Sequence, residues 1–197
     1  MGSLWAALVS KDRLAKVLAG NSFLNRFGLA VGGAAAPIQL VLIYTPGQAG
    51  LFQSTSVVAL LAGSFLGWLI PHIPLAGVFD AWNGIGNALS YLALALGPHI
   101  GLPVGLRATS YVAQSLSSPR MNAYAAEQFD DHERGRIYAA IQGVGSVLAP
   151  AGMLIGSLLL TPLGPRPLLI AGAGLTLLFT ALPTPTSPRR SGHKADE

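Results

Sequence analysis

The sequence EQFDDHERGRIYAAIQGVGSVLAPAGMLIGSLLL, residues 127–160, joins the most highly charged part of the chain to a long apolar run. Its first ten residues hold four of the eight acidic side chains of the protein, together with Arg134 and Arg136. The apolar run that follows carries glycines at helical spacing and one proline, Pro150. A short charged segment next to an apolar run of this length is typical of a water-exposed loop between two membrane spans. The stretch therefore predicts a helical membrane protein.

The composition favours the same class of protein. Charged residues make up only 10% of the 197 residues, against about 25% in soluble domains. A soluble domain of this length needs a polar surface that so few charges cannot supply, whereas lipid covers the outside of a membrane protein. Cysteine is absent, which excludes a disulfide framework and thiol chemistry. The net charge of +4 lies in the tails and one loop rather than along one face, so we expect no nucleic-acid partner.

Six apolar segments of roughly 17 to 25 residues are long enough to cross about 30 Å of hydrocarbon. They predict an all-α membrane protein with six transmembrane helices, at residues 23–45, 50–70, 75–97, 101–123, 137–160 and 167–183. Turns rich in proline and glycine are expected between them, at residues 45–48, 71–74, 97–99 and 161–165. Glycines four residues apart, such as Gly28 with Gly32 and Gly63 with Gly67, predict close approach of neighbouring helices.

The chain is expected to have three parts. Residues 1–20 form an amphipathic segment at the cytoplasmic membrane surface, residues 21–184 the six-helix domain, and residues 185–197 a disordered tail. With six spans, both tails share one side with the loops after the second and fourth spans. That side holds ten basic residues, and the opposite side holds Arg107 and Arg166. This asymmetry predicts a multi-pass protein of the cell (inner) membrane with both termini in the cytoplasm.

Polar side chains inside the spans are the first candidates for function, because a charge at mid-membrane costs about 2.5 to 3.5 kcal/mol or more. Six residues are interpreted as a path for a substrate or for protons: Asp80, Asn83, Asn87, Arg107, Gln114 and Gln142. Asn87 is closer in depth to Arg107 than Asp80 is, and is its expected partner. The alternative is that Asp80 is an interfacial loop residue, that Arg107 reaches the membrane surface, and that the two glutamines bond neighbouring helices.

The charged segment and the helix after it supply two further candidate groups. Glu127, Asp130, Arg134, Gly135 and Arg136 are interpreted either as a cytoplasmic gate or as a solvated turn that fixes topology, with Gly135 in a tight turn between two helices. The residues expected to pack or bend the next helix are Gly143, Gly145, Pro150, Gly152 and Gly156.

The sequence indicates no enzyme. It offers no Ser/His pair on facing spans, no paired mid-membrane aspartates and no cluster of metal ligands. We therefore expect no catalytic residue, no metal and no cofactor.

The same stretch resembles the major facilitator superfamily, at the cytoplasmic turn between the tenth and eleventh helices of drug-efflux members. There an acidic residue and a short polar turn precede Arg-Gly-Arg and a glycine-marked helix. Glu127, the turn at residues 130–131 and residues 134–136 match that order here. Residues 149–152 resemble the Gly-Pro-Gly antiporter motif of the family, with alanine at the first position, and residues 21–26 resemble the entry to the seventh helix. The resemblance covers residues 15–183.

The resemblance implies the C-terminal six-helix half of a major facilitator fold. Its function would be membrane transport of a small molecule, such as efflux of a drug or metabolite. Besides the lipid bilayer, it implies a second six-helix half or a copy of the chain as partner, because one half forms only one wall of the usual cavity. Residues 67–80 depart from the family, since they contain no Lys or Arg where a basic loop is common. This departure and the half length leave an alternative, a truncated, non-transporting membrane protein that acts as a remnant, assembly factor or immunity factor.

Overall fold

The computed structural model describes the backbone of residues 13–69, 76–97, 99–128 and 131–180 of the 197-residue chain. It describes the side chains of residues 26–69, 78–97, 99–119, 143, 146–178 and 180. Within these ranges the protein is all-α, as the sequence predicts. The six helices are α2 (Arg13–Ile43), α3 (Pro46–Leu69), α4 (Ala76–Leu96), α5 (Gly101–Gln128), α6 (Asp131–Leu163) and α7 (Pro165–Thr180).

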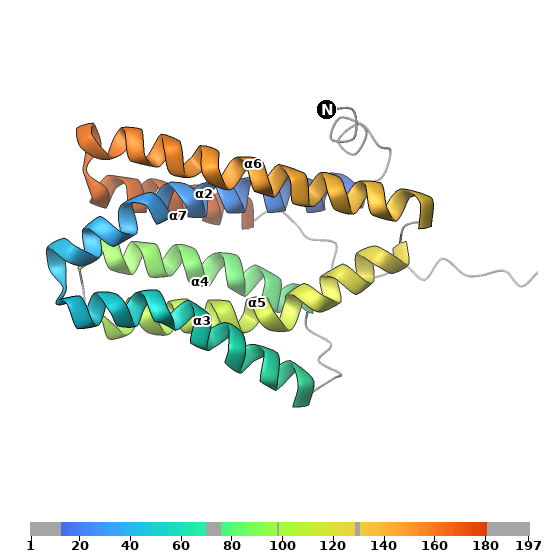
Figure 1. The fold of residues 1–197 in the computed structure, drawn as a ribbon, viewed down its shortest axis with the longest axis horizontal. Helices are drawn as coiled ribbons and strands as arrows, with labels where there is room; N and C mark the ends of the chain where they lie inside the picture. The colour runs from blue at the N-terminus through green and yellow to red at the C-terminus, as the bar shows by residue number, and fades with distance from the viewer. Residues whose placement is uncertain (1–12, 70–75, 98, 129–130, 181–197) are drawn as a thin grey trace, which may run out of the picture.

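The helices form two groups of three (Figure 1). In one group α2 packs against both α6 and α7, and in the other α5 packs against both α3 and α4. The packing of α4 against α7 is the most extensive contact between the groups. Pro37 lies inside α2, and the helix changes direction along its length towards α3 (Figure 1). A proline removes one backbone hydrogen bond from a helix and so accounts for such a bend.

The contacts between helices show an exchange relation: when each of the first three helices is exchanged with its counterpart among the last three, the main contacting pairs stay the same. Replacing α2 by α5, α3 by α6 and α4 by α7 converts the pair α2–α6 into α5–α3 and the pair α2–α7 into α5–α4. The pair α4–α7 is converted into itself. These are the most extensive contacts of the described helices. The two halves of the six-helix unit are therefore built on the same packing plan.

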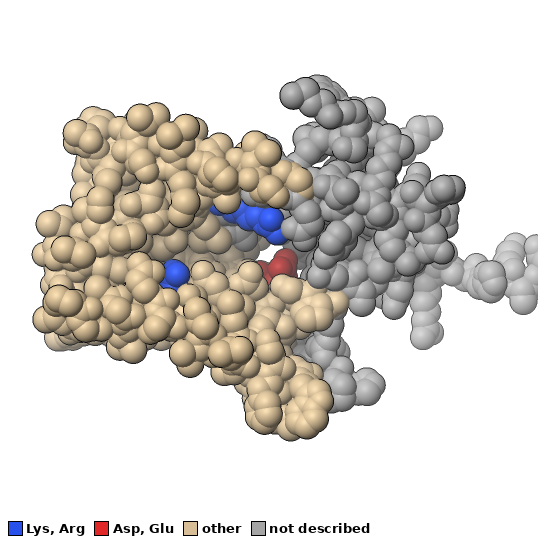
Figure 2. Space-filling view, in the orientation of Figure 1, with Lys and Arg blue, Asp and Glu red and all other residues tan. Residues whose placement is uncertain are grey.

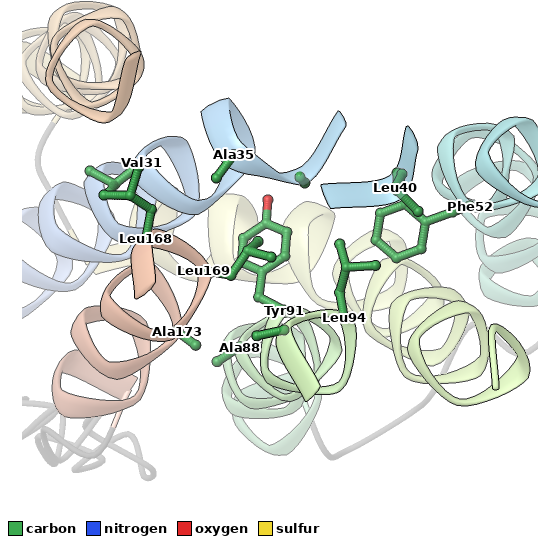
Figure 3. Packing of buried hydrophobic residues seen from close by; sticks show 12 residues of the cluster. Val31, Ala35, Leu40, Phe52, Ala88, Tyr91, Leu94, Leu168, Leu169 and Ala173 are labelled. Carbon is green, nitrogen blue, oxygen red and sulfur yellow. The ribbon is translucent and has the colours of Figure 1, made fainter. Parts of the chain in front are cut away.

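The hydrophobic core lies where α2, α4 and α7 meet, with Phe52 added from α3 (Figure 3). Tyr91 on α4 is central to this core, and Figure 3 shows its ring directed towards α2. Its hydroxyl donates a hydrogen bond of 3.2 Å to the carbonyl oxygen of Leu29. The polar end of the ring is thus paired while the ring itself fills the core.

Small residues allow the helices to approach closely. A Cβ added at Gly172 on α7 would lie 2.7 Å from both the carbonyl oxygen of Gly28 and the backbone nitrogen of Gly32 on α2. A Cβ at Gly63 on α3 would lie 2.8 Å from the carbonyl oxygen of Val112 on α5. Both distances are shorter than real Cβ contacts, so these crossings require glycine.

Two of the expected turns are largely helical. Thr45 precedes α3, its backbone nitrogen donates to Oε1 of Gln48 at 3.1 Å, and the Gln48 nitrogen donates to Thr45 Oγ1 at 3.4 Å. This is a capping box with Pro46 in the first helical position, where its missing N–H costs nothing. In the other expected turn, residues 161–165, only Gly164 lies between α6 and α7, and its φ is +76°. The expectation of turns over residues 45–48 and 161–165 was wrong because Pro46 and Pro165 start helices and Pro162 lies within the last turn of α6.

The charged stretch is also mostly helical. Helix α5 continues through Glu127 to Gln128, and α6 starts at Asp131, so Gly135 lies within a helix and not in a tight turn. Asp131 and Glu133 stand in the first turn of α6, where carboxylates are favoured by the helix dipole. This preference explains why the helix begins before the arginines. Asp130 lies outside the described residues, and the side chains of Glu127, Arg134 and Arg136 lie outside the described side chains.

Three helices contain segments long and apolar enough to cross a membrane: Arg26–Ile43, Pro46–Leu69 and Ser146–Leu163. They belong to α2, α3 and α6, and the sequence predicts spans in all three. The spans predicted for α4, α5 and α7 do not reach the same length and apolarity within the described residues. In α4 the polar residues Asp80, Asn83 and Asn87 lower the apolarity, and in α7 the apolar helix is shorter, Pro165–Leu178. Residues 13–20, expected in a surface segment, are the first turns of α2, and residues 1–12 lie outside the described residues.

Candidate functional site: an arginine between aromatic rings

Arg107 is held between two aromatic rings near the start of α5. Its Cζ atom lies 4.6 Å from the centroid of the Phe52 ring on α3 and 5.1 Å from the centroid of the Tyr111 ring on α5. Both distances are within the range of a cation–π interaction. Tyr111 follows Arg107 by four residues, so the two side chains share one face of the helix. Phe52 reaches the same place from α3 and is only 1% exposed.

The guanidinium of Arg107 is incompletely paired. The side chain also interacts with the hydroxyl of Tyr91 on α4. Its Nε atom, however, is buried and has no hydrogen-bond partner among the described atoms. A buried donor without a partner costs about 1 to 3 kcal/mol. Arg107 as a residue is only half-buried, so part of it remains at the surface of the bundle.

The buried polar residues around this site mostly bond to nearby backbone. Ser90 Oγ donates to the carbonyl oxygen of Pro103 at 2.8 Å, and Ser110 Oγ donates to that of Leu106 at 3.0 Å. Gln39 Nε2 on α2 donates to the carbonyl oxygen of Leu94 at 3.4 Å. These side chains therefore connect α2, α4 and α5 and supply no countercharge to Arg107.

The structure separates the residues expected to form a polar path. Asn87 is buried, and its Nδ2 donates to the carbonyl oxygen and to Oδ1 of Asn83, both at 2.9 Å. Asn87 thus bonds within α4, whereas the neighbours of Arg107 are the three aromatic residues. Asp80 is half-buried near the start of α4. It precedes Tyr91 by eleven residues, or about 16 Å along the helix, so it lies at a different level from Arg107.

The remaining predicted residues fall into three cases. Gln114 is half-buried on α5, one turn beyond Tyr111, and its carbonyl oxygen accepts a bond from Ser117. On α6, Gly152 and Gly156 face α2, while a Cβ at Gly143 would meet no atom within 4 Å and Pro150 is exposed. Gln142 and Gly145 lie outside the described side chains.

Charge is scarce on the described surface. The described acidic side chain is Asp80, and the described basic ones are Arg26, Arg107 and Arg166. In the view of Figure 2, basic and acidic side chains border the hollow between the two helix groups, another basic group lies apart from it, and the remaining described surface is uncharged. This hollow, referred to below as the central groove, opens between the α2–α6 and α3–α5 sides of the bundle (Figures 1 and 2).

Sequence reasoning missed Phe52, Tyr91 and Tyr111. Tyr111 could have been found from its spacing of four residues after Arg107. Phe52 starts the buried stripe of α3, which continues with Thr55, Ala59 and Gly63. That helical spacing was visible in the sequence, but nothing in it connects the stripe with Arg107. Tyr91 is brought to the site only by the packing of α4 on α5.

Comparison of the chain with protein-family models, with curated proteins and with solved structures finds no match in any of the three.

Proposed function

We propose that this protein is one six-helix half of a major facilitator-type secondary transporter, which moves a small molecule across the cell membrane by alternating access. Efflux of a drug or metabolite, driven by a proton gradient, is the activity that fits the resemblance of residues 127–160. Both termini would lie in the cytoplasm.

The observation that carries the proposal is the exchange relation between α2–α4 and α5–α7. Three helices are an odd number, so in a membrane the second triplet would start from the side opposite to the first. Two triplets with the same packing plan and opposite orientation are an inverted repeat, and such repeats build each half of a major facilitator transporter. In that fold the substrate site lies near the middle of the membrane, in the cavity between the two six-helix halves.

Polar and aromatic groups from both repeats meet around Arg107. Arg107 belongs to the second triplet, while Phe52 and Tyr91 belong to the first, so the site around the cation is formed where the repeats meet. A charge in a span costs free energy and is a functional candidate for that reason. Gln114, about two turns beyond Arg107 along α5, is half-buried and extends the polar surface.

The proposed partner is a second six-helix unit, either a copy of this chain or a separate chain. Helices α3 and α6 carry long rows of exposed apolar side chains, including Leu61, Phe65 and Trp68 on α3 and Leu154 and Leu158 on α6. Within the segments long enough to cross a membrane, only 17% of α3 and 11% of α6 is buried, against 44% of α2. Lipid covers part of these surfaces, and the second unit would cover the part beside the central groove.

The proposal is tested by transport in reconstituted vesicles. The full chain is inserted into liposomes, a pH gradient is imposed, and the uptake of a panel of labelled anionic, neutral and cationic organic solutes is timed. We expect at least one solute to move faster than in protein-free liposomes, and Arg107→Gln to remove most of that gain. Arg166→Gln is the matched control, because Arg166 is exposed at the start of α7. It should transport normally.

The same preparation reports on the partner. Chemical cross-linking in the vesicles should trap two six-helix units. A chain that stays a single unit and accelerates no solute would refute the transporter proposal and favour the non-transporting alternative.

A further inference from the structure

We infer that Arg107 is the binding point for an organic anion, a carboxylate joined to an apolar body, beside the rings of Phe52 and Tyr111. This inference rests on the proposed function, because it takes Arg107 to lie on the path of the transported molecule. It adds the chemical class of that molecule, which the transport proposal leaves open.

The first step is that Arg107 has no countercharge among the described side chains. Among the described side chains the one carboxylate is Asp80, which stands eleven residues before Tyr91 on α4 and so about 16 Å from its level. The described contacts of the guanidinium are the Phe52 and Tyr111 rings and the Tyr91 hydroxyl. Rings and a hydroxyl stabilise a cation only in part, and Nε remains without a partner. A cation that is only partly stabilised in an apolar bundle attracts an anion.

The second step is that the site is shaped for a planar anion. Rings at 4.6 and 5.1 Å restrain the guanidinium, and Phe52 is itself fixed because it is fully packed. A restrained guanidinium presents its N–H groups as a fork that matches the two oxygens of a carboxylate. The same rings form apolar walls beside the fork. A molecule with a carboxylate and an apolar body satisfies both features, whereas an organic cation would be repelled by Arg107.

The test is direct binding to the purified full chain in detergent, without a gradient. Titration calorimetry is carried out with benzoate, with benzamide, which has the same shape without the charge, and with benzylamine, which has the opposite charge. We expect saturable binding of benzoate at least tenfold tighter than that of the other two. Empty micelles give the correction for partitioning. Because this comparison uses the unaltered chain, it decides the matter without any variant.

Variants then locate the site. Arg107→Gln should weaken benzoate binding at least tenfold, and Arg107→Lys should weaken it less, because it retains the charge and loses the fork. Arg166→Gln should bind benzoate as the unaltered chain does. Equal binding of benzoate and benzylamine, absence of benzoate binding, or unchanged binding in Arg107→Gln would each overturn the inference.

Failure of this inference and failure of the transport proposal give different results. Binding of benzoate through Arg107 without movement of any solute in vesicles would leave an anion site in a protein that does not transport. Movement of neutral or cationic solutes without benzoate binding would leave a transporter of another substrate class.

Discussion

Arg107 shows how a single charge can be kept inside an apolar bundle. The ring faces of Phe52 and Tyr111 carry partial negative charge, and each such contact stabilises the guanidinium by about 0.5 to 2 kcal/mol. That is of the same order as the cost of the unpaired Nε, about 1 to 3 kcal/mol. The cation is therefore tolerated without a carboxylate from the described part of the chain, and it keeps its capacity to bind one.

The contribution of the Phe52 ring can be measured with a matched pair on α3. Phe52→Leu keeps an apolar side chain of similar volume and removes the ring next to Arg107, so we expect a loss of about 1 to 3 kcal/mol in the free energy of unfolding in mixed micelles. Phe65→Leu changes the same residue type where it is 60% exposed, and the loss should stay below about 0.5 kcal/mol. Equal losses in the two variants would contradict the role of the ring at Arg107.

A second residue-scale prediction concerns two glycines on α7. Gly172→Ala should lower the free energy of unfolding by about 1 to 3 kcal/mol, because its Cβ would meet the backbone of α2 at 2.7 Å. Gly174→Ala adds the same methyl group where no atom lies within 4 Å, and should leave stability unchanged or raise it by up to about 1 kcal/mol. Unfolding in increasing denaturant measures both, and a harmless Gly172→Ala would show that α2 and α7 do not cross so closely.

At the scale of elements, helix ends were harder to predict than helix positions. The predicted segment 75–97 is found as a helix, α4 (Ala76–Leu96), because hydropathy marks the middle of a helix, although α4 is not among the helices apolar enough to span a membrane. Pro46 and Pro165 were predicted to lie in turns, but each is the first residue of a helix. Proline can either end a helix or begin one, and which of the two occurs depends on the neighbouring groups that hydrogen-bond the free backbone groups. Pairings between helices, such as Phe52 with Arg107, depend on packing and leave no periodic signal in the sequence.

The capping box at the start of α3 gives an element-scale prediction. Thr45→Ala removes the hydroxyl that accepts from the Gln48 backbone, and should destabilise the first turn by about 1 kcal/mol. Amide hydrogen exchange at Gly47 and Gln48 should then be about fivefold faster. Ser54→Ala is the control, because the Ser54 hydroxyl bonds to a carbonyl within the exposed helix surface. Unchanged exchange at both amides in Thr45→Ala would contradict a capping function.

At the scale of the whole molecule, α3 and α6 occupy equivalent positions. Each lies at an edge of the bundle and packs chiefly on one helix, α3 on α5 and α6 on α2, through glycines. The rest of their surfaces is exposed and apolar. Of these two edge helices, only α3 adds a buried residue to the described core of α2, α4 and α7, namely Phe52.

Engineered disulfides can test this equivalence in a chain that has no cysteine of its own. Cysteines replacing Ala30 and Gly152 should link α2 to α6, since a Cβ at Gly152 would lie 2.9 Å from the Ala30 Cβ. Cysteines replacing Gly63 and Ser115 should link α3 to α5, since a Cβ at Gly63 would lie 2.6 Å from the Ser115 Oγ. A small separation of α2 and α6 brings the first pair to the ~3.5 to 4.5 Å between Cβ atoms that a disulfide needs.

The control for the disulfides pairs Gly63 with Gly152, which lie on the edge helices α3 and α6. Mass spectrometry after oxidation and proteolysis should find the two expected links within single chains and none in the control. A link between residues 63 and 152 within one chain would show that the two groups of helices are arranged differently.

The uneven apolarity of the helices also bears on how the protein enters a membrane during synthesis. The membrane-length segments of α2, α3 and α6 are each apolar enough to enter lipid on their own. Helices α4 and α5 carry Asp80 and Arg107, and a charged residue opposes insertion, by up to about 2.5 to 3.5 kcal/mol at the bilayer centre and by less nearer a helix end. We therefore expect α4 and α5 to be retained in the bilayer as a pair, because the two helices pack extensively on each other. The order in which the ribosome delivers them, adjacent along the chain and after α3, suits that joint entry.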